Sequence, residues 1–119
     1  MQVIDKQYKI TRNQYGVRIS IKHAVEAYIS VKAAQGGYEY PIGYLEIITI
    51  NTETTSELII YPGSGGVLGK DGYPTRIKTL PSGDIISCRG GTGNGEPRPS
   101  ADAVVWIDVK TELCSEPND

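Results

Sequence analysis

The amino-acid sequence has few of the residues on which metal and acid–base chemistry depend. It contains one histidine, His23, two cysteines, Cys88 and Cys114, and no phenylalanine. Two thiols and one imidazole are too few for a structural zinc site or for a small scaffold held together by disulfides. We interpret the cysteines as two reduced thiols, with a single Cys88–Cys114 disulfide as the alternative. The sequence predicts no metal centre and no cofactor.

Long apolar segments are also missing from the sequence. No stretch approaches the roughly 20 apolar residues of a membrane-spanning helix. The first twenty residues carry charges throughout and lack the apolar run of a signal peptide. We therefore expect no membrane segment and no membrane partner. The cellular location stays open, and synthesis in the cytoplasm is consistent with the sequence.

The sequence also lacks an excess of positive charge. Twelve Lys and Arg face fourteen Asp and Glu, which gives a formal net charge of −2, and no basic block interrupts the balance. Proteins that bind nucleic acid rely on clustered positive charge to attract the phosphate backbone. Nucleic acid is therefore not an expected partner. The length of 119 residues is close to the usual size of one domain, so we expect a single domain over residues 1–119.

The residues that are abundant favour β-structure. The chain has fifteen Ile, eight Val, nine Thr and eight Tyr, against five Leu and six Ala. Residues branched at Cβ and aromatic residues suit strands, whereas Leu and Ala are better helix formers. Fourteen Gly and seven Pro imply many turns. The predicted fold is an all-β, single-domain antiparallel sandwich or small barrel of about seven strands.

One long segment, 17–31, alternates apolar and polar residues, as in a strand with one buried face. A strand of this length must bend, pair with two partners or change to helix partway. A short helix over 23–35, capped at Gly36, is the alternative and would make the fold α+β. The alternation places His23 on the apolar face, where it is expected to be a satisfied core residue.

Two hairpins and a late strand are predicted further along. Residues 45–50 and 57–61 are apolar runs around a polar turn near 51–55, and 75–80 and 85–89 flank a turn of Pro-Ser-Gly-Asp. Residues 103–109 form the last strand, with Trp106 in the core. Residues 1–6 are expected to be a flexible arm and residues 114–119 a polar tail.

Two glycine-rich segments, 62–74 and 90–100, are predicted to be long surface loops. The first contains Gly-Lys but lacks the spacing, the following Ser or Thr and the helix of a phosphate-binding loop. Asp71, Asp84, Asn94 and Glu96 lie in turns and loops without the spacing of a calcium-binding loop. Because such loops can become ordered on a neighbouring molecule, we include four residues in or beside them as candidate interface or ligand residues: Gly65, Gly66, Arg89 and Arg98.

Tyrosines cluster in the segment Gly-Tyr-Glu-Tyr-Pro-Ile-Gly-Tyr, as Tyr38, Tyr40 and Tyr44. In an extended chain Tyr38 and Tyr40 share a face. A tyrosine ring with its hydroxyl suits both protein interfaces and sugar stacking. Our first interpretation is that these three tyrosines replace the absent phenylalanines as partly buried strand aromatics, and we add them to the candidate interface or ligand residues as the alternative.

No catalytic constellation is visible in the sequence. His23 is the only imidazole base, and apart from Arg89 nothing near Cys88 in the sequence lowers its thiol pKa. We expect no catalytic residues and no enzyme. The leading hypothesis is a non-enzymatic structural module that docks on other protein subunits, its own copies or a larger shell or filament, for example a virion accessory protein of the capsid-decoration or tail kind. The alternative is a carbohydrate- or ligand-binding β domain that uses the tyrosine cluster.

Overall fold

The computed structural model describes residues 2–32, 45–66, 70–90 and 102–113. Within these ranges the chain forms strands and one short 3₁₀ turn, η1 (Arg12–Gln14), with no α-helix. The strands are β1 (Gln2–Ile10), β2 (Val17–Ser20), β3 (Ala24–Lys32), β4 (Leu45–Ile50), β5 (Glu57–Tyr61), β6 (Thr75–Leu80), β7 (Asp84–Cys88) and β8 (Val104–Leu113).

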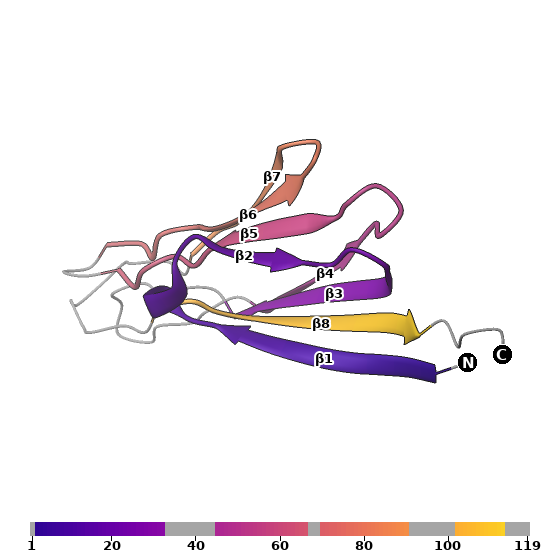
Figure 1. The fold of residues 1–119 in the computed structure, drawn as a ribbon. Helices are drawn as coiled ribbons and strands as arrows, with labels where there is room; N and C mark the ends of the chain where they lie inside the picture. Colours follow the sequence, from indigo (N-terminus) through magenta and orange to yellow (C-terminus); the bar gives the residue numbers. More distant parts are fainter. Residues whose placement is uncertain (1, 33–44, 67–69, 91–101, 114–119) are drawn as a thin grey trace, which may run out of the picture.

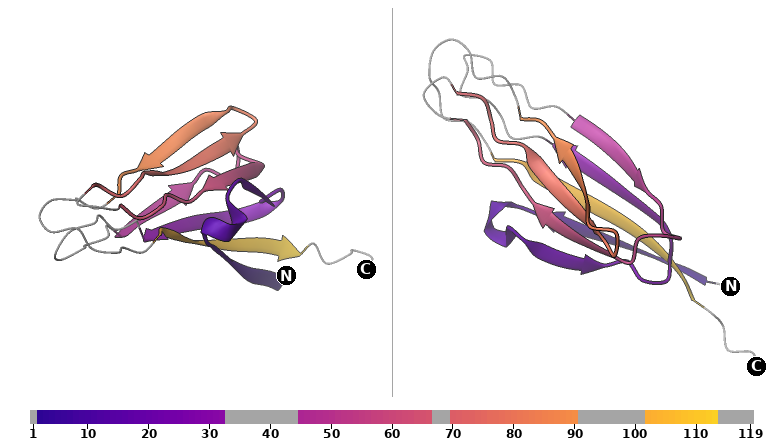
Figure 2. Two further views of the ribbon diagram at one scale, coloured as in Figure 1. Left: turned by 90° about the vertical axis from the view of Figure 1, so that its left-hand side faces the viewer. Right: turned by 90° about the horizontal axis from the view of Figure 1, so that it is seen from above.

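The strands form two four-stranded sheets that pack face to face. The first sheet has the order β1-β8-β3-β4 and the second the order β2-β5-β6-β7, and every pair of neighbours is antiparallel. Figure 1 shows the two layers one above the other, and Figure 2 shows them from two further directions. The predicted all-β sandwich is confirmed, and the alternative of a helix over 23–35 is wrong for the described residues 23–32 because they form β3 and the turn before it.

The core lies between the sheets and is built mainly from β-branched side chains. Alternate residues of each strand point inward, as the period of two requires. Each central strand therefore contributes a row of buried residues, while its other face points to solvent. The largest fully buried side chains include Ile10, Ile29, Val31, Val105 and Ile107 from the first sheet and Leu58, Ile60 and Ile77 from the second.

The long alternating segment bends at Lys22 and His23 and serves both sheets, β2 in one and β3 in the other. The turn reverses the alternation, so that Ala24 is buried and His23 is exposed. A bulge between Ala24 and Glu26 then restores the original phase. The turn and the bulge each shift the alternation by one residue, and the two shifts cancel. The alternation therefore looks uninterrupted in the sequence. The expectation that His23 is a core residue is wrong.

The hairpin predicted for 45–50 and 57–61 is wrong, although both strands exist. β4 pairs with β3 in the first sheet, whereas β5 pairs with β2 and β6 in the second. The segment between them turns on Asn51, whose side chain accepts a hydrogen bond from the Glu53 amide at 2.9 Å, and then crosses between the layers. Because both strands present apolar residues to one core from opposite sides, the sequence pattern resembles that of a hairpin.

The second predicted hairpin is confirmed as β6 and β7, paired from Thr79 and Asp84 outward. Its turn includes a cis Leu80–Pro81 bond and Gly83 with a φ of +81°. A left-handed φ of this kind favours glycine. The last predicted strand is also confirmed as β8, which lies between β1 and β3.

Two further expectations need correction. Residues Gln2–Lys6 are part of β1 and pair with β8 from Leu113 to Val109, so they are not a free arm. Trp106 is half-buried on the outer face of the first sheet, because its neighbours Val105 and Ile107 take the inward positions. The predicted tail, 114–119, lies outside the described residues.

Candidate functional site

Of the candidate residues predicted from the sequence, Tyr38, Tyr40, Tyr44 and Arg98 lie outside the described residues, as do Asn94, Glu96 and Cys114. Gly65 and Gly66 are part of the backbone framework at one end of the sandwich. The Gly65 amide donates a hydrogen bond to Asp102 Oδ1 at 2.8 Å, and a Cβ on Gly66 would collide with the Lys70 and Asp71 backbone. Both glycines therefore have a structural role.

Arg89 is exposed directly after β7, beside a hollow of about 360 Å³ that Asp71 and Gly90 also line. Gly65 and Gly66 are not in the lining of this hollow, but Gly66 packs against the backbone of Asp71, which is. Of the sequence-predicted residues that the structure describes, Arg89 alone lines this hollow.

The two residues considered for nucleophilic catalysis are separated in the fold. His23 is exposed in the turn between β2 and β3, and Cys88 is a buried free thiol at the end of β7. Burial, reinforced by the charge of Glu46 and a hydrogen bond to its side chain, raises the pKa of the Cys88 thiol to about 11. A thiol protonated at neutral pH is a poor nucleophile.

The backbone of His23 has a φ of +70°, which asparagine or glycine accepts more readily than a β-branched residue does. We expect His23→Val to lower the free energy of unfolding by about 1–2 kcal/mol, and His23→Gly to change it by less than about 1 kcal/mol. Urea denaturation of both variants checks this. Equal effects of the two substitutions would contradict the strained turn.

A site that was not predicted from the sequence lies over the second sheet, where η1 comes next to β5 and β6. We call it the basic-aromatic groove. It consists of two adjoining hollows of about 360 and 240 Å³ that share Tyr15 and Arg76. The charged, tyrosine and large aliphatic side chains that line it are Arg12, Tyr15, Tyr61, Tyr73, Arg76, Lys78 and Ile85.

The aromatic part of the groove is held by ring contacts. Tyr15 and Tyr61 meet edge to face, with ring centroids 5.2 Å apart. The Arg12 guanidinium lies over the Tyr15 ring at 4.5 Å and donates a hydrogen bond to the Pro62 carbonyl at 2.9 Å. Stacking and the hydrogen bond together fix the position of this cation. Tyr15 nevertheless remains 56% exposed and Tyr73 63% exposed.

The floor of the groove is backbone held by short hydrogen bonds around Gly63. The Gly63 amide donates to Thr75 Oγ1 at 3.0 Å, and its carbonyl accepts from the Ala103 amide at 2.9 Å. The Tyr73 amide donates to the Ser64 carbonyl at 2.9 Å. Three chain segments that are distant in the sequence are thereby fixed beneath the tyrosines.

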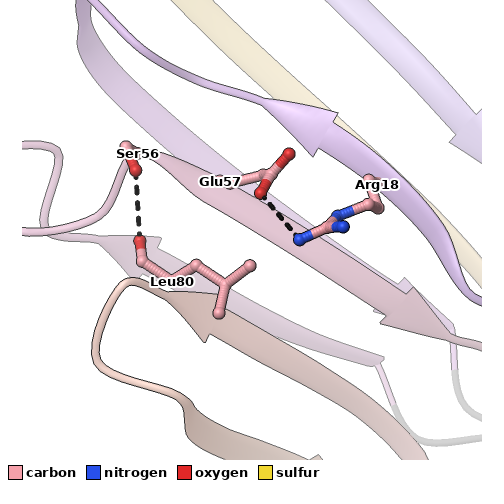
Figure 3. A network of polar contacts seen from close by, with 4 residues as sticks. All are labelled: Arg18, Ser56, Glu57 and Leu80. Atoms are coloured by element: carbon pink, nitrogen blue, oxygen red, sulfur yellow. Dashed lines mark hydrogen bonds and ion pairs between the residues drawn. The ribbon is translucent and has the colours of Figure 1, made fainter.

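The groove is positively charged although the whole chain is not. Arg12, Arg76 and Lys78 are in its lining, and none of its described lining residues is acidic. Glu57, on the same outer face, is held by Arg18 of β2 at 3.1 Å between Nη2 and Oε1 (Figure 3). Within the part of the chain that the structure describes, no hydrogen bond or ion pair involves the head group of Arg76 or Lys78.

Part of this groove had a signal in the sequence. Alternation in 57–61 and 75–80 predicts that Tyr61, Arg76 and Lys78 share an outward face. The contribution of Arg12 and Tyr15 had no such signal, because it depends on how the link from β1 to β2 crosses between the sheets.

The outer face of the first sheet is the second notable surface, and we call it the docking face. Register places Lys9, Trp106, Ser30 and Ile47 in one row across β1, β8, β3 and β4. The next row contains Gln7, Asp108, Tyr28 and Thr49. Ile47 is 71% exposed, the highest fraction among the exposed large apolar side chains of the described residues.

Comparison with protein-family models, with curated protein sequences and with solved structures gives no significant match. Among the described residues, no group of three or more His, Cys, Asp or Glu side chains is placed to hold a metal ion. The described ranges also contain no helix long and apolar enough to cross a membrane.

Proposed function

We propose that the protein is a non-enzymatic structural module that docks on other protein subunits, and that its docking face binds a second copy of the chain. The observation that carries this proposal is the exposure of Ile47. The sandwich core covers its neighbour Ile48 in part but leaves Ile47 in solvent. A contact between copies would bury Ile47 together with Trp106 and Tyr28, and aromatic residues of this kind are enriched in interface centres.

The charges on the docking face support a second copy as the occupant. Lys9 and Lys32 lie toward one end of the strands, and Asp5 and Glu112 toward the other. Glu26, also at the acidic end, pairs with Lys110 at 3.5 Å. A two-fold axis that lies between the two facing sheets and runs across their strands places the basic end of one copy on the acidic end of the other, as a self-complementary interface requires.

The size of the face is sufficient for such a contact. Four strands about 4.8 Å apart with about eight residues each cover roughly 500 Å². Two copies face to face would thus bury about 1,000 Å², which is the area at which specific interfaces begin.

The test is light scattering coupled to size-exclusion chromatography over a concentration series. We expect wild-type chains to dimerise and Ile47→Lys to raise the dissociation constant at least about tenfold, because it places a charge at the most exposed large apolar side chain of the docking face. Ile85→Lys, a matched change at a 62% exposed residue on the opposite outer face, should leave the dimer intact. A wild-type monomer at all concentrations would overturn the proposal.

Charge exchange tests the orientation of the two copies. Lys9→Glu should weaken the dimer, and Lys9→Glu combined with Asp5→Lys should restore it, because the combination exchanges the two ends of the face. Sedimentation equilibrium measures both effects. Failure of the double variant to recover would contradict the antiparallel arrangement.

The environment of Cys88 supports a non-enzymatic role, since this buried thiol, the only one among the described residues, has a pKa of about 11. An accessory role on a virus particle, as a capsid-decorating or tail component, is the most concrete form of the proposal. The support for it is the strand-rich sandwich, whose outer face exposes Ile47.

A further inference from the structure

We propose that the basic-aromatic groove is a separate docking site for an acidic segment of another protein, in which a carboxylate lies close to a large apolar side chain. The groove is on the second sheet and the docking face is on the first, so the two surfaces are on opposite sides of the sandwich. This inference therefore does not depend on self-association.

The two arginines of the groove indicate that the ligand carries a carboxylate. Arg12 and Arg76 both line the larger hollow. A guanidinium presents N–H groups in a planar fork that matches a carboxylate. Arg12 already has its position fixed by Tyr15 and the Pro62 carbonyl, so little side-chain entropy remains to be lost on binding. The absence of acidic residues from the described lining leaves this charge to be complemented by a ligand.

The lining of the smaller hollow indicates that the ligand also carries a large apolar side chain. Ile85 is 62% exposed there, opposite Lys78 of β6, and Tyr61 lines the same hollow. An aliphatic or aromatic side chain would cover Ile85, whereas the hydroxyl-rich surface of a sugar would not. A nucleic acid would require a longer track of phosphate contacts than three cations supply. The groove therefore favours a peptide over a glycan or a nucleic acid.

The arrangement of the two hollows sets the distance between the acidic and the apolar residue in the sequence of the ligand. Because they adjoin at Tyr15 and Arg76, the two side chains must be close in the partner's sequence. In an extended peptide, residues two apart point to the same side and lie about 7 Å apart. The expected pattern is an Asp or Glu two positions away from a large apolar residue.

The experiment is selection of a random peptide phage library on the immobilised full chain, followed by fluorescence anisotropy with labelled synthetic copies of the enriched peptides. We expect enrichment of the acidic–apolar pattern. Arg76→Gln and Ile85→Ser should each raise the dissociation constant at least about tenfold, and 0.5 M NaCl should weaken binding. The matched controls Lys32→Gln and Ile47→Ser, on the docking face, should leave peptide binding unchanged.

Arg76 and Ile85 suit this test because both side chains are exposed, and thermal melting should show that the variants stay folded. The proposal is overturned if no peptide is enriched, if the enriched peptides lack acidic residues, or if Arg76→Gln binds them as tightly as wild type. It is also overturned if a heparin oligosaccharide or single-stranded DNA binds the groove while the peptides do not. Light scattering of the same variants reports on self-association separately, so that failure of one proposal is distinguishable from failure of the other.

Discussion

Replacing Gly63 by alanine is expected to lower the free energy of unfolding by about 3 kcal/mol or more, the sum of overpacking and weakened buried hydrogen bonds. A Cβ at this position would meet the Tyr73 and Pro74 carbonyls at distances that real Cβ atoms do not adopt. Both obstacles are backbone, so no side chain can rotate away. The segments around Gly63 must separate instead.

Separation would break the contacts that hold the groove floor. The buried hydrogen bond from the Gly63 amide to Thr75 Oγ1 and the bond from the Ala103 amide to the Gly63 carbonyl both depend on this close approach. Urea denaturation measures the loss, and Ser64→Ala, which adds no atom at the neighbouring residue, is the matched control. A Gly63→Ala variant as stable as Ser64→Ala would show that the three segments are not packed closely here.

The strands were predictable from the sequence because each depends on a local pattern. Alternation and β-branched residues identify 45–50, 57–61, 75–80 and 103–109, and the short turn containing Gly83 identifies the hairpin that β6 and β7 form. These signals act over a few residues. They report that a segment has one buried face, without reporting which sheet contains it.

The assignment of strands to sheets was not predictable in the same way. Residues Leu58 and Ile50 point toward one core from opposite layers, and a hairpin would give the same apolar spacing. Likewise, the bulge at Ala24 and Glu26 conceals the turn at His23 by restoring the alternation. Local periodicity is unchanged by either feature, so only long-range pairing distinguishes the alternatives.

The candidate sites show the same limit. Ile47 points outward because of its position in the alternation of β4. Its place in a row with Trp106 depends on two strand pairings, β4 with β3 and β3 with β8. The groove joins residues that are more than sixty positions apart, Arg12 and Arg76. A net charge of −2 conceals its positive character, because the charge is an average over the whole chain.

The Cys88 thiol is expected to react with iodoacetamide at pH 8 about 100-fold more slowly than the thiol of the unfolded chain. Only the thiolate reacts, and raising the pKa from 9.0 to about 11 lowers the thiolate fraction by that factor. The rate is measured by mass spectrometry in a Cys114→Ser background. Glu46→Gln, which removes the carboxylate charge beside the thiol, should speed the reaction, and Glu53→Gln in the exposed loop after β4 should not. Equal rates in folded and unfolded chains would contradict the buried thiol.

The same pKa difference predicts a loss of stability in alkali. As pH rises through 9, the thiol of the unfolded chain ionises while that of the folded chain stays protonated, so the unfolded state is favoured. The stability that the neutral thiol contributes is therefore complete below pH 9 and is lost as pH approaches 11. Because other groups also titrate there, the measurement is the difference between wild type and Cys88→Ala in urea denaturation at several pH values. The difference should shift in favour of Cys88→Ala across this window, and parallel curves would show that Cys88 titrates alike in both states.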